Sequence, residues 1–161
     1  MSKNATNSES KSLKEERYSI VEINGTLFGI EILKSREVFP LPKITPVPNT
    51  KSSVVGVFNL RGEIHPLFDI SSVLGMAGKA LQDTDMIVLL EKDETVMGIL
   101  ADRVYGVRIV GDEMIKPAQG SIPRAMVDYV KGMISDKSTE IFLLNVDRII
   151  SAIFESQFGY N

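Results

Sequence analysis

The sequence of 161 residues contains no cysteine and only one histidine. The absence of cysteine excludes disulfides, thiolate metal sites and a cysteine nucleophile, and it fits a reducing cytosol. His65 stands between Ile64 and Pro66 in a strand-like segment, with no second ligand at metal spacing. We interpret it as a packing residue, and we expect neither a metal nor a cofactor.

Long apolar runs and blocks of positive charge are also missing. No apolar run approaches the ~20 residues of a membrane helix, and the polar N-terminus lacks the apolar core of a signal peptide. We therefore expect a soluble, cytoplasmic protein without direct membrane insertion. The net charge is −3 and lysines and arginines form no block, so we expect no nucleic-acid partner.

The residues of a catalytic site are not assembled in any recognisable pattern. The glycines form neither a Walker motif nor a GxGxxG run, and turns or bulges explain them. The carboxylates Asp93 and Glu94 fall in a charged turn, and Asp69 is better used as a helix cap. We predict that the protein is not an enzyme.

The most informative stretch that is present runs from Val54 to Leu74, VVGVFNLRGEIHPLFDISSVL. Apolar, β-branched residues predict two strands, and Asn59–Gly62 predicts the hairpin turn between them. Gly56 suits a bulge or a close backbone approach. Asp69 predicts the start of a short helix that ends at Gly75.

A similar pattern recurs later in the chain. Val54–Leu74 aligns with Val130–Ile150, and Tyr18–Ile30 aligns with Ile87–Ile99. The first alignment pairs Gly56 with Gly132, and the second pairs Gly29 with Gly98. The shared order of apolar positions predicts two related halves.

The sequence as a whole predicts an all-β protein. Residues 1–17 are polar and predict a flexible tail, followed by a single domain over 18–156. Short strands separated by turn signals predict two small barrels, over about 18–80 and 85–156. Apolar residues at helical spacing predict a C-terminal helix over Val146–Ser156, capped by Asn145.

Four residues outside the core pattern are candidate contacts. Arg61 stands at a turn tip and Glu37 beside Val38 and Phe39, and each fits either a solvated position or a binding contact. The segment Leu41–Asn49 carries three prolines, which predict a rigid extended loop. Its Ile44 and Val47 form either a partner surface or part of their own barrel.

Several runs in the chain resemble one known family. They are KSREVFPLPKITPVPN, VVGVFNLRGEIHPLFDI, MGILADRVYGV, YVKGMI and EIFLLNVDRII, which together extend over most of Tyr18 to Phe154. These runs are similar to those of the CheW family of chemotaxis coupling proteins. The most specific is Gly56–Ile70, and the turn Asp102–Val104 supports it.

The resemblance implies two five-stranded SH3-like β-barrels that share an apolar core, and a non-catalytic signalling adaptor. Such adaptors bridge the cytoplasmic tips of methyl-accepting chemoreceptors to the regulatory domain of the histidine kinase CheA. They are recruited to receptor arrays at the inner face of the membrane, where CheW-like barrels can also pair end to end into rings.

Positions matching the family motifs imply which residues meet each partner. The receptor-binding candidates are Glu37, Val38, Leu60, Arg61 and Val104, and the kinase-binding candidates are Ile44 and Val47. Two alternatives remain open on the residues alone. One is a small-barrel module that binds nucleic acid or another ligand, and the other is an enzyme built around His65.

Overall fold

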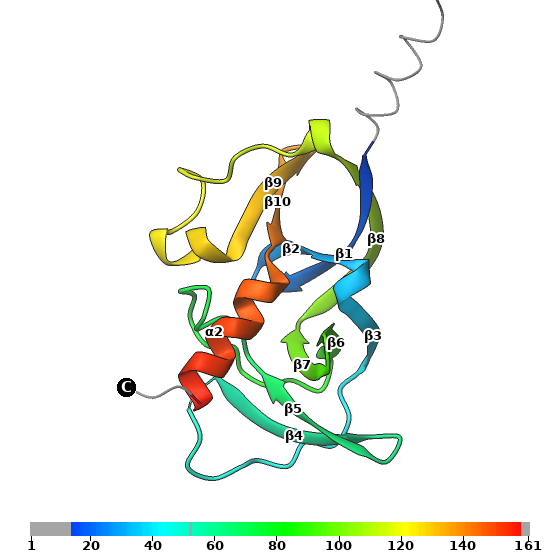
Figure 1. The fold of residues 1–161 in the computed structure, drawn as a ribbon, viewed down its shortest axis with the longest axis vertical. Coiled ribbons are helices and arrows are strands. Elements are labelled where there is room, and N and C mark those ends of the chain that lie inside the picture. Colours follow the sequence, from blue (N-terminus) through cyan, green and yellow to red (C-terminus); the bar gives the residue numbers. More distant parts are fainter. Residues whose placement is uncertain (1–13, 52, 159–161) are drawn as a thin grey trace, which may run out of the picture.

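The computed structural model describes residues 14–51 and 53–158 of the chain. Its strands form two five-stranded sheets, in the orders β8-β1-β2-β10-β9 and β3-β6-β7-β5-β4. Both sheets curve into small barrels, stacked one above the other in Figure 1. The fold is therefore all-β with few helices, as the sequence predicts.

We call the first sheet the terminal barrel and the second the central barrel. The terminal barrel contains β1 (Glu15–Ile23), β2 (Thr26–Glu31), β8 (Arg103–Gly111), β9 (Val130–Asp136) and β10 (Thr139–Leu144). The central barrel contains β3 (Ser35–Pro40), β4 (Val54–Leu60), β5 (Glu63–Phe68), β6 (Met86–Lys92) and β7 (Thr95–Ala101). Short 3-10 helices lie at Ile32–Lys34, Asp112–Met114 and Arg124–Tyr129, and the helix α2 spans Val146–Phe158.

The barrels do not follow the expected boundaries of 18–80 and 85–156. The terminal barrel combines the first two strands with the last three, and the central barrel takes the five between them. Parallel pairing joins the exchanged hairpins, β2 with β10 and β5 with β7. Local sequence patterns define each hairpin, but they do not define which other hairpin packs beside it. The expected boundaries of the two barrels were wrong for this reason.

The internal repeat is nevertheless visible in space. Gly29 pairs with Leu143 in the terminal barrel, and Gly98 pairs with Leu67 in the central barrel. Gly56 lies against the backbone of Thr45, and Gly132 lies in the same way against Lys116. Two of the glycine pairs that align in the sequence therefore occupy equivalent close approaches, where a side chain would collide with its neighbour.

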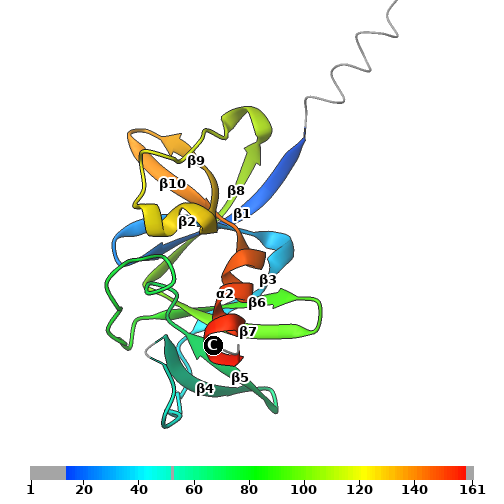
Figure 2. The same ribbon diagram turned by 60° about the vertical axis from the view of Figure 1, so that its left-hand side comes forward.

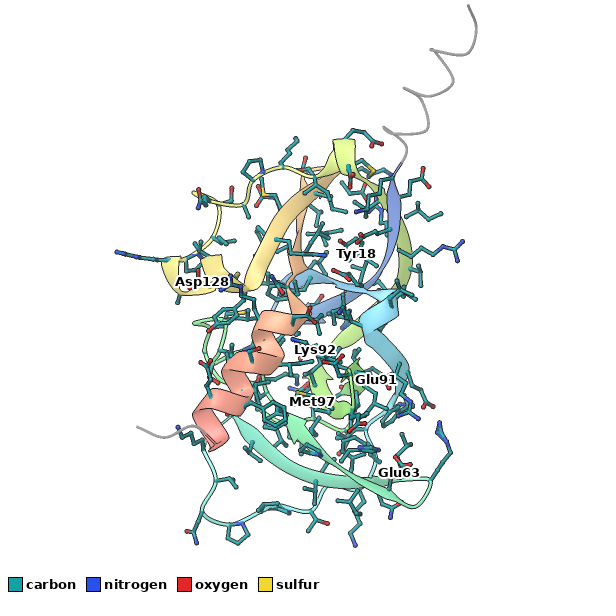
Figure 3. All side chains as sticks on the ribbon, viewed as in Figure 1. Tyr18, Glu63, Glu91, Lys92, Met97 and Asp128 are labelled. Atoms are coloured by element: carbon teal, nitrogen blue, oxygen red, sulfur yellow. The ribbon has the colours of Figure 1, made fainter. Side chains whose placement is uncertain are left out.

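Three apolar clusters fill the described part of the molecule. One fills the terminal barrel around Tyr18, a second fills the central barrel around Phe58, and the third and largest joins the two barrels. In β6, Ile87 and Leu89 belong to the central-barrel cluster, whereas Val88 belongs to the joining cluster. Figure 3 shows Tyr18 in the upper barrel and Met97 in the lower one.

Helix α2 begins where the sequence predicts. Asn145 Oδ1 accepts the backbone N–H of Arg148 at 3.2 Å, which caps the first turn. Its apolar residues, including Val146 and Ile149, pack into the joining cluster. Figure 2 shows the helix running from the junction of the barrels along the central one.

Two local predictions were wrong. Strand β1 begins at Glu15, so residues 15–17 of the expected tail pair with β8; residues 1–13 lie outside the described part of the chain. Residues 70–75 form turns instead of a short helix. Asp69 still acts as a local cap, because its Oδ1 accepts the N–H of Ser71 at 3.0 Å.

Candidate functional site

The β4–β5 turn presents Arg61 at the tip of a hairpin of the central barrel. Arg61 and Gly62 both have positive φ, at 50° and 89°, as a two-residue type I′ hairpin turn requires. Asn59 Oδ1 accepts the N–H of Gly62 at 3.0 Å and braces the turn. The arginine side chain therefore leaves a rigid hairpin tip and is 65% exposed.

Arg61 forms a bidentate ion pair with Glu37 of strand β3. The Nη1–Oε1 and Nη2–Oε2 distances are 3.2 and 2.5 Å. The sequence indicated both residues as contacts, but it did not indicate that they bind each other across 24 residues. An exposed ion pair adds only about 0–1 kcal/mol to stability. Its main effect is to hold the guanidinium in one orientation at the rim.

A small hollow of about 80 Å³ lies beside this pair, lined also by Leu60, Glu63 and His65. Small-molecule sites usually measure about 300–1,000 Å³, so this hollow does not suit a substrate. His65 is buried, its Nε2 lies 3.2 Å from Glu63 Oε2, and its ring packs on Phe58. Figure 3 labels Glu63 near the β4–β5 turn. The histidine is thus held by packing and one carboxylate.

The five predicted receptor-binding residues do not form one patch. Glu37, Leu60 and Arg61 line the same small hollow of the central barrel. Val38 and Val104 are partly buried and pack against the cluster that joins the barrels. The alternation of β3 explains why Val38 is separated from Glu37. Glu37 pairs with Leu89 of the central-barrel cluster, whereas Val38 pairs with Val88 of the joining cluster, on the opposite face.

Sequence reasoning missed an apolar row on strand β8. Tyr105, Val107 and Ile109 are each more than half exposed, and β8 is the edge strand of the terminal barrel. The register shifts between Ile20 and Val21 of β1, which leaves Tyr105 as the extra residue of a bulge. The alternating pattern of Val104–Val110 was the available signal. Apolar side chains grouped on an exposed edge strand make β8 a candidate interaction surface.

The proline-rich loop has a buried side and an exposed side. Leu41 and Ile44 pack against the interior cluster of the central barrel. Thr45 exchanges two backbone hydrogen bonds of 2.9 Å with Val57, which fixes the loop along β4. Val47 is 37% exposed. Of the two predicted kinase-binding residues, one is thus largely packed and the other is accessible.

Residues 14–51 and 53–158 contain no group of three or more acidic, histidine or cysteine side chains arranged to hold a metal ion. Within the same part of the chain, no helix has both the length and the apolar character needed to cross a membrane.

Comparisons with known proteins agree with this architecture. The family model described as a CheW-like domain matches residues 17–154. The chemotaxis protein CheW of Thermotoga maritima is 30% identical over 88% of this chain and 91% of its own length. CheW of Klebsiella aerogenes is 26% identical over 85% of this chain and 82% of its own length.

A solved structure has the same fold. The scaffolding protein TtCheW from Thermoanaerobacter tengcongensis superposes with a TM-score of 0.72, covering 82% of this chain and 90% of its own, at 22% identity. The chain belongs to the CheW-like domain family. This membership supports an adaptor role in chemotaxis.

Proposed function

We propose that this chain is a non-catalytic chemotaxis adaptor that couples methyl-accepting receptors to the histidine kinase CheA in membrane-associated arrays. The observation that carries the proposal is the exposed Arg61–Glu37 pair. Arg61 lies in Gly56–Ile70, the run most specific to the family, and Glu37 lies in another of the matching runs. The charged pair is rigidly presented beside a hollow too small for a substrate. Such a surface suits a protein partner.

The receptor is proposed to bind along the two edge strands, β3 and β8. Glu37 and Arg61 supply charge at one end, and Val38 and Val104 supply apolar contact near the junction of the barrels. The exposed Val107 and Ile109 extend that apolar surface along β8. An amphipathic receptor helix, with an apolar stripe and a few charged residues, fits this combination of charged and apolar contacts.

The regulatory domain of CheA is proposed to bind the rigid loop of the central barrel. Val47 is the accessible apolar residue there, and Ile44 supports the loop from beneath. The loop and the Arg61 turn belong to different segments of the barrel, and the proposal requires that both partners bind at once. Weak separate contacts then become effective through high local concentration in an array, where CheW-like barrels also pair into rings.

A bridging assay tests the proposal. A receptor cytoplasmic fragment is fixed to beads and mixed with the isolated CheA regulatory domain, with and without this chain. We expect the kinase domain to be retained only when the chain is present. Capture of one partner without the other would reduce the function to a single-partner module, and capture of neither would overturn the proposal.

A further inference from the structure

A buried cluster of ion pairs is centred on Lys79, in the segment between β5 and β6. The side chain of Lys79 is only 2% exposed, and its Nζ lies 2.6 Å from Asp85 Oδ1 and 3.0 Å from Asp102 Oδ1. Asp85 is 1% exposed and Asp102 is 24% exposed. Removing such charges from water costs several kcal/mol per ion unless each is paired. The segment between β5 and β6 is therefore fixed at its centre.

The positions of the two carboxylates connect this cluster to the proposed receptor surface. Asp85 immediately precedes β6, the strand that pairs with β3. Asp102 immediately precedes β8 and is the residue at which the chain passes from the central barrel to the terminal barrel. Lys79 thus joins the start of β8 to the strand that supports β3.

Further hydrogen bonds extend the cluster into both barrels. The N–H of Asn24, in the β1–β2 turn of the terminal barrel, donates to Asp102 Oδ2 at 2.7 Å. Its side-chain amide donates to the carbonyl of Ala77 at 2.6 Å. The N–H of Lys79 donates to Asp69 Oδ2 at 2.7 Å, just beyond β5 of the central barrel. The network therefore spans the junction instead of stabilising one barrel.

We propose that Lys79 is a positioning residue that holds β3 and β8 in the relative arrangement required by the receptor. This inference rests on the proposed function, because the two strands that Lys79 connects form the proposed receptor surface. Stability alone does not explain the cluster, because well-packed apolar groups often replace a buried ion pair without loss. The cluster is explained if it fixes the angle between the barrels. Its ion pairs are directional and join different elements, so they favour one relative orientation.

The chain offers a matched control for this role. Lys131 of β9 pairs with Glu31 of β2 and donates to Tyr18 Oη at 2.9 Å. All three residues belong to the terminal barrel. The Lys131 side chain is 30% exposed. Loss of its charge therefore removes a partly buried, paired cation without affecting the connection between the barrels.

The first measurement is the distance between the barrels. The chain has no cysteine, so cysteines introduced at the exposed Glu94 and Glu140 carry the only two spin labels. We expect Lys79→Met, and the milder Asp102→Asn, to shift or broaden the distance distribution by about 2 Å or more, the scale of domain rearrangements. Lys131→Met should leave it unchanged. Unchanged distributions in both cluster variants would overturn the proposal whether or not any partner binds.

The second measurement separates positioning from stability. Lys79→Met/Asp85→Asn removes both buried charges, so we expect it to recover most of the stability lost in Lys79→Met. Its affinity for the receptor fragment should nevertheless stay about tenfold below wild type, a typical coupling strength, while its affinity for the CheA domain is unchanged. Recovery of receptor affinity together with stability would make Lys79 merely structural. If wild type binds neither partner, the proposed function fails and the distance measurement alone decides the role of Lys79.

Discussion

The carbonyl oxygen of Thr45 lies so close to Gly56 that a Cβ on that glycine would stand 2.5 Å from it. The contact fixes the proline-rich loop along β4, and backbone atoms on both sides leave little room for relaxation. It links a loop proposed to bind a partner to the hairpin that presents Arg61.

Gly56→Ala should therefore destabilise the protein by about 1–3 kcal/mol, the usual cost of overpacking. Urea unfolding measures the loss. Gly78→Ala is the control, because the nearest neighbour of its Cβ is 4.0 Å away, and its effect should stay within about 0.5 kcal/mol. Equal stabilities of the two variants would contradict the close approach.

Arg61→Glu should weaken receptor capture without harming the fold. The side chain is exposed and its ion pair is a surface one, so the free energy of unfolding should change by about 0.5 kcal/mol or less. Binding to a receptor fragment and thermal melting measure the two effects. The double exchange Glu37→Arg/Arg61→Glu restores attraction within the pair but reverses the charges shown to the partner. Restored receptor binding in that variant would indicate that the pair only braces the surface.

Val47→Glu and Ile44→Ala should separate binding from folding in the proline-rich loop. Val47 is exposed, so its change should reduce CheA binding at nearly unchanged stability. Ile44 packs on the central-barrel cluster, and its truncation should cost about 1–2 kcal/mol, less than the 2–5 kcal/mol of a fully buried site. Unaltered CheA binding by Val47→Glu, measured by calorimetry, would move the kinase surface elsewhere.

Stability should decline in alkaline solution. Burial by itself lowers the pKa of Lys79, but hydrogen bonds and attraction from Asp85 and Asp102 outweigh it and leave that pKa above the ordinary 10.5. Burial raises the pKa of the Tyr18 hydroxyl above 10.0. In both cases the folded state holds its proton more tightly than the unfolded state, so the stabilisation is complete below these ordinary values.

This contribution to stability is lost as the pH rises through the raised pKa values of Lys79 and Tyr18. Urea unfolding at increasing pH should show constant contributions from these groups up to about pH 10 and a fall above it. Lys79→Met should make the alkaline fall shallower, because one of the groups responsible is gone. An identical slope in wild type and variant would show that the Lys79 pKa does not differ between the folded and unfolded states.

Local structure could be predicted from the sequence because it depends on neighbours along the chain. The Asn24-Gly25 and Arg61-Gly62 turns both adopt positive φ at each residue, as their turn chemistry requires. The apolar spacing and cap of α2 likewise define its start. Glu37 and Arg61 could likewise be identified as candidate contacts, because each lies in a short run of the sequence.

The sequence by itself thus determined the hairpins, the C-terminal helix, the internal repeat and the family. Tertiary structure alone decided that the hairpins of the two halves are exchanged between barrels. It also decided that Glu37 meets Arg61, that Val38 faces the other side of its strand, and that Lys79 is buried between two carboxylates. Each of these depends on contacts between distant segments, and periodicity along a strand gives its buried face but not the segment that covers it.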